Sequence, residues 1–210
     1  MTTQTPLRWY FDFISPFSYL QWPRVRGLSV ARPVVPVPIL LGAVLDARGQ
    51  KGPAEIPGKR EFTYRHVLWQ ARRQGIALRF PPRHPFNPLH ALRLCIAAGT
   101  TADAVTAIFD WVWADGRAAD DIDALTPLLA RFGLTSEALG EPAVKAALRD
   151  NTQAALDAGV FGVPTLAIGG TLFWGNDAHD FAAAALDDPS LLDDDEMCRV
   201  ATLPIGIRRG

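Results

Sequence analysis

The chain has 210 residues, 49% of them hydrophobic, so it can bury a substantial core as one domain with an insertion or as two small domains. Its formal net charge is −1 with dispersed charges, which argues against a nucleic-acid or membrane-surface partner. Cys95 and Cys198 are far apart and lack metal-like spacing. The N-terminus lacks a signal-peptide pattern and no apolar run could span a bilayer, so we expect a cytoplasmic protein with two inert thiols.

The first forty residues predict a strand, a helix and a second strand. LRWYFDF (7–13) combines aromatic and other bulky residues without Gly or Pro and predicts a strand. Ser15 supplies an N-cap and Pro16 a favourable first helical residue, so a helix is expected over 16–27. PVVPVPIL (33–40) is extended, but its three prolines restrict it to a sheet edge or an irregular strand.

The middle of the chain carries helical patterns only. Over 59–74, Phe62, Val67 and Ala71 recur at helical spacing. Further segments show the same periodicity, and several begin with Ser, Thr, Asp or Pro, as helices do. They are 88–99, 102–114, 122–132, 135–139 and 142–158.

A hairpin and a helix follow. GVPTLAIGGTLFWG (162–175) reads as two short strands joined by two glycines. Asn176 or Asp177 can cap a helix over 176–186. The acidic run DDPSLLDDDE (187–196) predicts a solvated tail segment.

The order of these elements predicts the fold class. A β-α-β unit, a block of helices and a β-β-α unit together give an α/β protein, a thioredoxin fold interrupted by an all-helical insertion domain. We expect the thioredoxin-like domain to be discontinuous and to comprise residues 1–43 and 159–210. The helical insertion domain then covers residues 44–158.

Two short motifs flank this insertion. Ser15 stands at the carboxyl end of an apolar strand where a helix begins, a position at which ligands bind in α/β folds. Val163-Pro164 precedes a predicted strand, where a thioredoxin fold carries a cis proline facing its active site. Each motif also has a purely structural interpretation, as a helix cap and as a trans strand-entry proline. Ser18, one turn further on, is expected to face the helix or solvent.

Four stretches together resemble the 2-hydroxychromene-2-carboxylate isomerase family, relatives of the kappa-class glutathione transferases in the disulfide-oxidoreductase branch of the thioredoxin superfamily. They are FDFISPFSYL (11–20), RGQKGPAEIPGKREF (48–62), GVFGVPT (159–165) and LFWGND (172–177), in the family's order. The resemblance implies glutathione as cofactor. It places Ser15 where disulfide-exchanging relatives keep a reactive cysteine.

A serine at this position cannot exchange disulfides, but its hydroxyl can donate a hydrogen bond to a thiolate. The free thiol of glutathione has a pKa of roughly 8.5, so only a small fraction is ionised at neutral pH. A hydroxyl donor and the following helix N-terminus both favour the anion. Lowering the thiol pKa by one to two units corresponds to roughly 1.4–2.7 kcal/mol. Ser15 is therefore predicted to stabilise the thiolate and not to act as a nucleophile.

The resemblance also implies residues that hold the tripeptide. Val163, preceding Pro164, would pair its backbone with the cysteinyl unit, and Asn176 and Asp177 would meet the γ-glutamyl end. Lys59 would meet the glycyl carboxylate. The structural alternatives are helix capping for Asn176 and Asp177 and a solvated surface position for Lys59.

One loop departs from the family pattern. It reads Gly49-Gln50-Lys51-Gly52, where family members usually carry Asn in the turn and a proline in place of Gly52. Gln50 keeps the amide on a longer arm, so it is predicted to bind glutathione, in a loop that is looser or shaped for another thiol.

The second substrate is expected between the two domains. Aromatic side chains suit a flat aromatic acid, and a cationic group suits its carboxylate. The predicted pocket residues are Phe17, Trp69, Arg83, His84 and Trp174.

The function implied is a glutathione-dependent isomerase. It would convert 2-hydroxychromene-2-carboxylate, or a related bicyclic aromatic acid, to trans-o-hydroxybenzylidenepyruvate by reversible thiolate addition. The implied partners are glutathione, a small aromatic carboxylate and a second copy in a homodimer. The alternatives are a kappa-like glutathione transferase and a non-catalytic thiol- or peptide-binding protein. A disulfide oxidoreductase is disfavoured because no cysteine lies near Ser15.

Overall fold

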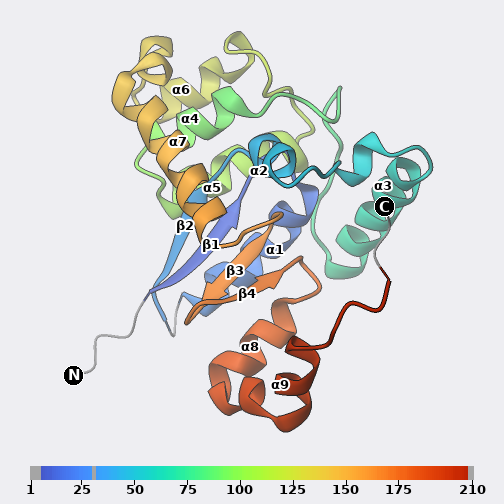
Figure 1. Ribbon diagram of the computed structural model, residues 1–210. Helices are drawn as coiled ribbons and strands as arrows, with labels where there is room; N and C mark the ends of the chain where they lie inside the picture. The colour runs from blue at the N-terminus through green and yellow to red at the C-terminus, as the bar shows by residue number, and fades with distance from the viewer. Residues whose placement is uncertain (1–5, 30–31, 208–210) are drawn as a thin grey trace.

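A four-stranded mixed sheet forms the centre of the computed structural model, which describes residues 6–29 and 32–207 (Figure 1). The strand order is β2-β1-β3-β4. β1 pairs in parallel with β2 and antiparallel with β3, and β3 pairs antiparallel with β4. The bounds are β1 Leu7–Phe11, β2 Val34–Pro38, β3 Thr165–Ile168 and β4 Thr171–Trp174. The predicted α/β thioredoxin fold is confirmed.

The strands lie where their residues favour them. β1 is central and buried except at Arg8, as expected for an apolar strand covered on both faces. β2 contains Pro36 and Pro38 and pairs on one side only, so the predicted edge position is confirmed. Gly169 and Gly170 both have positive φ, 56° and 93°, which the two-residue hairpin between β3 and β4 requires.

Helices cover both faces of the sheet. On one face the aromatic rings of Trp9 and Phe11 stack at 4.6 Å and pack against Phe109. This core includes residues of α1 (Pro16–Leu28) and continues into the helices of the middle segment. On the other face Tyr10 belongs to a smaller cluster with residues of α2 (Leu41–Ala47) and α7 (Pro142–Asp157). The core is thus continuous between the sheet and the middle segment, while the two domain boundaries remain a prediction.

The middle segment is helical, as predicted, but some bounds differ. The α-helices are α2, α3 (Lys59–Gln74), α4 (Leu89–Ala97), α5 (Ala102–Phe109), α6 (Thr126–Arg131) and α7. Short 3-10 turns lie at Pro53–Glu55, Asp123–Leu125 and Ser136–Gly140. The segment predicted to be helical over 102–114 is helical throughout, and its second half, Asp110–Ala114, forms a π-helical turn after α5. α2 was not predicted, since seven residues without a capping side chain give a weak signal.

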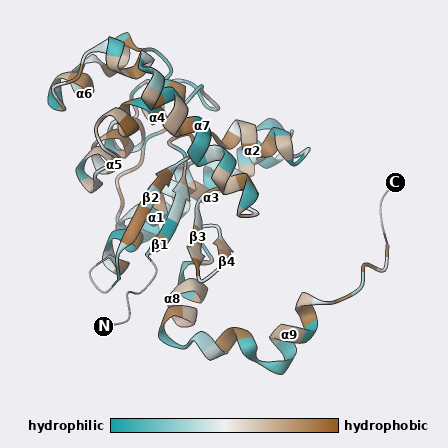
Figure 2. Ribbon diagram, turned by 60° about the vertical axis from the view of Figure 1, so that its left-hand side comes forward, coloured by the Kyte–Doolittle hydropathy of each residue, from teal (hydrophilic) through white to brown (hydrophobic). Residues whose placement is uncertain are grey.

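The last part of the chain contains more helix than expected. α8 spans His179–Asp187, a 3-10 turn spans Pro189–Asp193, and α9 spans Asp195–Ala201. The acidic run is exposed apart from two leucines, but it is not an irregular tail, because Asp188 and Asp194 cap the two short helices. Figure 2 shows α9 and residues 202–207 standing away from the rest of the molecule.

No helix in the described part of the chain is long and apolar enough to cross a bilayer.

His179, the first residue of α8, predicts a pH dependence of stability. The residue is 5% exposed, and burial lowers its pKa from 6.5 to about 4, with Arg24 contributing in the same direction. The unfolded chain binds this proton below about pH 6.5, whereas the folded chain binds it only near pH 4. Its contribution to stability is therefore lost as pH falls through that window.

Urea unfolding of wild type and His179→Gln at about pH 7 and pH 4.5 measures this effect. We expect the free energy of unfolding of His179→Gln to rise relative to that of wild type when the pH is lowered. An unchanged difference would show that the imidazole titrates alike in both states.

Candidate functional site

Ser15 lies at the carboxyl end of β1 and caps α1. Its Oγ accepts a hydrogen bond from the Ser18 backbone N–H at 3.2 Å, and Pro16 occupies the first helical turn. Ser15 is 6% exposed. Within the described residues its hydroxyl donates no hydrogen bond, so its hydrogen is available for an acceptor beside the helix N-terminus. Ser18 is fully buried and therefore faces the protein interior, not solvent.

Two side chains from the helical segment hold the backbone just before Ser15. Trp113, on the π-helical turn, donates from Nε1 to the Phe13 carbonyl at 2.8 Å. His84 Nε2 lies 2.9 Å from the Ile14 carbonyl, which can only accept, so the hydrogen is on Nε2. Nδ1 is then an acceptor for the Tyr64 hydroxyl at 2.6 Å. Burial lowers the pKa of His84, which favours the neutral imidazole.

Asp12 holds the same turn from the other side. Its Oδ1 accepts from the Ile14 N–H at 3.1 Å and its Oδ2 accepts from the Leu41 N–H at 2.8 Å, so one carboxyl joins this turn to the start of α2. Burial raises the pKa of Asp12 to about 7, although the backbone N–H groups of Leu41 and Ile14 act in the opposite direction. Sequence reasoning missed this residue, although a lone carboxylate inside an apolar strand pattern is itself a signal.

The Val163-Pro164 motif lies at the same end of the sheet as Ser15. Tyr10 pairs with Thr165 in the antiparallel register, so the residues after β1 lie beside those before β3. The Val163–Pro164 peptide bond is cis, as the resemblance implied. The Pro164 carbonyl accepts from the Gly175 N–H at 2.8 Å, which brings the turn after β4 to this edge.

That turn carries Asn176 and Asp177. Gln21 of α1 donates to the Gly175 carbonyl at 3.0 Å and so fixes the turn against the helix. Asn176 is 5% exposed and donates from Nδ2 to Gln70 of α3 at 3.2 Å. Its buried Oδ1 has no partner within the described residues. Asp177 is exposed at the surface.

A pocket of about 610 Å³ adjoins this turn. Its walls carry both cations and carboxylates. Arg24 is ion-paired with Asp180, and the Arg73 guanidinium lies 5.3 Å from the centre of the Trp69 ring. Such a mixture suits a zwitterionic group that carries both an ammonium and a carboxylate. The lining residues are Pro23, Arg24, Trp69, Gln70, Arg73, Gln74, Ile76, Asn176, Asp177 and Asp180.

The other two residues predicted to bind the tripeptide, Lys59 and Gln50, are both exposed. Lys59 is the first residue of α3 and is exposed. It precedes His66 by seven residues, about 10 Å along the helix axis, and His66 lies 6.4 Å from Phe17 between ring centroids. Gln50 is exposed in the loop after α2, where its N–H donates to the Leu45 carbonyl at 2.9 Å.

The predicted pocket for a second substrate is brought together only in part. Phe17 is half-buried beside α3, Trp69 is 53% exposed on that helix, and Trp174 is 53% exposed. Arg83 is ion-paired with Asp120 at 3.0 Å. Both ring nitrogens of His84 have partners within the chain, and its predicted place in the substrate pocket stays a prediction.

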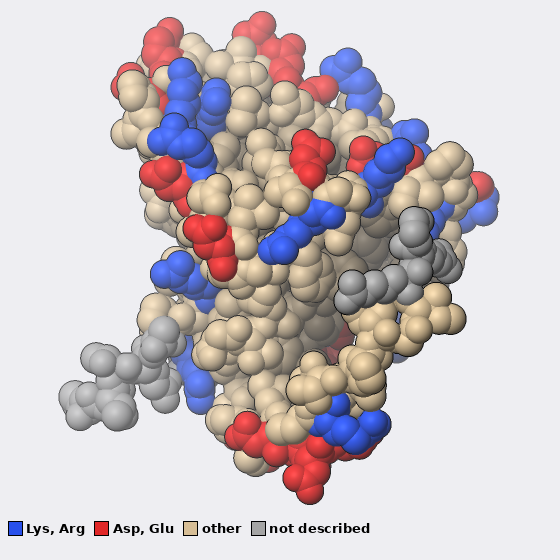
Figure 3. Space-filling model, viewed as in Figure 1, with Lys and Arg blue, Asp and Glu red and all other residues tan. Residues whose placement is uncertain are grey.

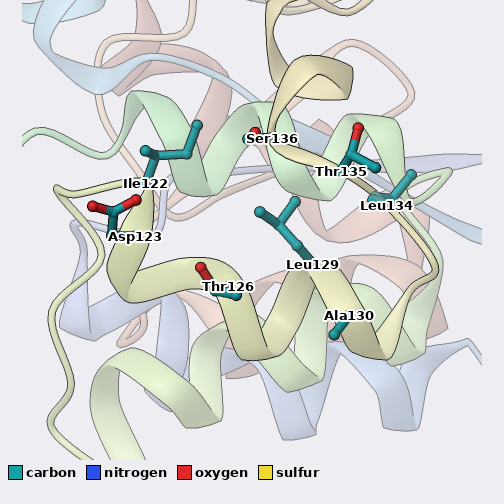
Figure 4. Close-up of a pocket in the computed structure, with 8 residues that line it drawn as sticks. All are labelled: Ile122, Asp123, Thr126, Leu129, Ala130, Leu134, Thr135 and Ser136. Atoms are coloured by element: carbon teal, nitrogen blue, oxygen red, sulfur yellow. The ribbon is translucent and has the colours of Figure 1, made fainter.

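Other features lie apart from this edge of the sheet. Figure 4 shows a hollow of about 250 Å³ between α6 and the 3-10 turn that follows it, lined by Ile122, Asp123, Thr126, Leu129, Ala130, Leu134, Thr135 and Ser136. Among the residues that the structure describes, no group of three or more His, Cys, Asp or Glu side chains is placed to hold a metal ion. Cys95 is buried, which raises its thiol pKa to about 12.

The sheet order, the capping serine and the cis proline define a thioredoxin-type domain, and residues 7–187 match the DsbA-like thioredoxin domain. A 2-hydroxychromene-2-carboxylate isomerase of Pseudomonas putida is 32% identical over 182 residues, covering 80% of this chain and 87% of that protein. The enzyme of that name from Sphingobium xenophagum is 31% identical over 188 residues, covering 85% and 96%. A solved 2-hydroxychromene-2-carboxylate isomerase superposes with a TM-score of 0.77 at 26% identity, covering 91% of this chain and 99% of that one. The chain belongs to the 2-hydroxychromene-2-carboxylate isomerase family.

The hydrogen bonds that hold the turn before Ser15 are predicted to affect the pKa of a thiol placed at residue 15. A thiol introduced by Ser15→Cys sits at a helix N-terminus, so we expect its pKa below the ordinary value of about 8.5. His84→Asn changes the group that bonds to the Ile14 carbonyl, and Tyr64→Phe removes the hydroxyl that holds His84. Adding either substitution is expected to raise that pKa by about one unit. Ultraviolet thiolate absorbance against pH measures the change.

Arg83→Gln in the same Ser15→Cys background is the matched control, because Arg83 neighbours His84 but its partner is Asp120. An equal thiol pKa in all four proteins would refute a positioning role for Tyr64 and His84.

Proposed function

We propose that the protein is a glutathione-dependent isomerase that converts 2-hydroxychromene-2-carboxylate, or a related bicyclic aromatic acid, to trans-o-hydroxybenzylidenepyruvate. The observation that carries the proposal is the Ser15 hydroxyl. It caps α1 at the same sheet end as the cis Val163–Pro164 bond, and its hydrogen is not used within the described residues. The relatives named as this isomerase support the substrate class.

Ser15 is proposed to stabilise a thiolate. Its Oγ is already an acceptor for the Ser18 N–H, so the remaining capacity of the hydroxyl is to donate. A donor beside the positive end of α1 favours an anion over the neutral thiol. Because the turn before Ser15 is held by Trp113 and His84, the hydroxyl needs little reorganisation when a thiolate arrives.

The rest of the edge offers positions for a glutathione tripeptide. We place the cysteinyl backbone against Val163 and Pro164, and the γ-glutamyl end in the pocket beside Asn176 and Asp177. The unpartnered Asn176 Oδ1 and the mixed charges of that pocket fit an ammonium and a carboxylate. Lys59 and Gln50, both exposed, are proposed for the glycyl end.

The second substrate is proposed to lie against Phe17, Trp69 and Trp174, with Arg83 available only if its surface ion pair with Asp120 opens. Bound glutathione would supply a nucleophilic thiolate whose reversible addition turns a C=C bond into a rotatable single bond. Ser15 would hold the thiolate before addition and after elimination, while the aromatic side chains orient the flat acid. A cytoplasmic location remains part of this proposal.

Calorimetry with glutathione, combined with ultraviolet thiolate absorbance, tests the role of Ser15. Wild type is expected to bind glutathione with a dissociation constant of about micromolar to millimolar and to show thiolate near neutral pH. Ser15→Ala is expected to bind but to lose the thiolate signal, whereas Ser15→Thr keeps a hydroxyl and retains part of it. Absence of binding by wild type would refute a glutathione enzyme.

Counting glutathione during turnover distinguishes the isomerase from a kappa-like transferase. Isomerisation returns the thiol, so total free glutathione is expected to stay constant while 2-hydroxychromene-2-carboxylate is consumed. Depletion of glutathione in proportion to product would instead show conjugation. Binding with no turnover would favour the non-catalytic alternative.

A further inference from the structure

A chain of hydrogen bonds joins three side chains beside the candidate site. Asn176, on the turn after β4, donates from Nδ2 to Gln70 Oε1 at 3.2 Å. Gln70 in turn donates from Nε2 to His66 Nε2 at 3.1 Å. His66 and Gln70 are four residues apart on α3, so their side chains lie on the same side of that helix. The hydrogen-bond chain therefore runs from α3 to the turn that carries Asn176.

The contact between Gln70 and His66 fixes the position of the imidazole hydrogen. A side-chain amide nitrogen can only donate, so the lone pair of the His66 ring lies on Nε2 and its hydrogen lies on Nδ1. The ring also stacks with Phe62 at 5.6 Å and with Trp69 at 6.0 Å between centroids, and this stacking holds its plane. His66 thus presents an acceptor to Gln70.

The acceptor on His66 decides which atom of the Asn176 amide remains unpaired. Because Gln70 turns its Nε2 toward His66, its Oε1 faces Asn176, which must supply the donor Nδ2. The atom left over is Asn176 Oδ1, which is buried and has no partner among the described residues. With a donor in place of the imidazole acceptor, both amides would rotate, and Asn176 would leave its Nδ2 unpaired instead.

The unpaired atom belongs to a residue in the wall of a pocket. Gln70 and Asn176 both line the pocket of about 610 Å³ described above. Asn176 is 5% exposed, so water has little access to the atom that the hydrogen-bond chain leaves over. A buried acceptor without a partner favours a ligand group that donates, and a buried donor without a partner favours one that accepts.

We propose that His66 is a specificity-determining residue that acts through Gln70. As an acceptor at Nε2 it leaves Asn176 Oδ1 free for the ligand, so Asn176 favours an ammonium over a carboxylate. This preference rests on the proposed function, which places the γ-glutamyl end of glutathione in the pocket, whereas the orientation of the two amides does not. Because it acts through another side chain, His66 is a positioning residue and not a catalytic one.

Charges around the pocket act on the same ligand through space. Arg24 and Arg73 supply cations, and Asp177 and Asp180 supply carboxylates. Figure 3 shows basic side chains on the side of the molecule that bears α3 and acidic ones gathered at the end that bears α9. A charge introduced in place of the imidazole would change ligand affinity even without the hydrogen-bond chain. Gln70→Leu is the matched control, because it breaks the hydrogen-bond chain and leaves the charges in place.

Nitrogen-15 NMR of the imidazole rings in the free protein tests the hydrogen-bond chain without a ligand. Above neutral pH we expect His66 to be the Nδ1–H tautomer in wild type and to gain Nε2–H tautomer in Gln70→Leu, because the hydrogen bond to Nε2 selects the tautomer. His66→Gln identifies the signal among the four histidines. An Nε2–H tautomer in wild type, or a tautomer that Gln70→Leu leaves unchanged, would overturn the inference.

Calorimetry with two analogues of glutathione tests the ligand preference. 4-Aminobutanoyl-cysteinylglycine keeps the ammonium of the γ-glutamyl end, and glutaryl-cysteinylglycine keeps its carboxylate. We expect the affinity for the first analogue relative to the second to be about tenfold or more lower in His66→Lys, which supplies a donor, than in His66→Glu, which supplies an acceptor. In the Gln70→Leu background only the through-space part of this difference is expected to remain.

Failure of the hydrogen-bond chain and failure of the glutathione site give different results. An equal difference between His66→Glu and His66→Lys in both backgrounds would mean that charge acts through space alone, and the role of Gln70 would be refuted. If no protein bound either analogue while the His66 tautomer responded to Gln70→Leu, the orientation of the amides would stand. The glutathione site, and with it the ligand preference, would then be refuted.

Discussion

The Ser15 turn is held by hydrogen bonds from outside the thioredoxin sheet, and the geometry of the candidate site depends on them. Buried carbonyls must find donors, and those of Phe13 and Ile14 find them in Trp113 and His84. Both donors belong to the middle segment of the chain. The helices inserted into the fold are therefore part of the site's support, since they fix the backbone from which the capping hydroxyl projects.

The same edge of the sheet combines buried polar side chains with a charged, exposed rim. Asp12, Asn176 and His179 are all buried. Burial raises the pKa of Asp12 and lowers the pKa of His179, and it leaves the side-chain oxygen of Asn176 without a hydrogen-bond partner among the described residues. Arg24, Arg73 and the carboxylates around the neighbouring pocket stay accessible to water. Preorganised polar groups over a buried floor favour a charged ligand that brings its own counter-charges.

The loop that departs from the family pattern has its own internal support. The Gly52 N–H donates to the Glu55 carboxylate at 2.6 Å, so the short 3-10 turn before α3 is closed without the usual proline. Gln50 remains exposed at the start of this loop. Lys59 therefore remains at the head of α3, and Gln50 carries its amide on a longer side chain than an asparagine would.

The amino-acid sequence by itself determined the order of elements, because apolar periodicity, proline at an edge strand and two glycines at a hairpin are local signals. The Ser15 cap and the element sequence β-α-β, helices, β-β-α were predictable in this way. Only the tertiary structure showed that His84 contacts the Ile14 carbonyl of the turn, that Asp12 joins two loops, and that the helix over 102–114 ends in a π-helical turn. The hydrogen bonds behind these features join residues 29 to 100 positions apart in the chain, and no local pattern specifies which donor reaches which acceptor.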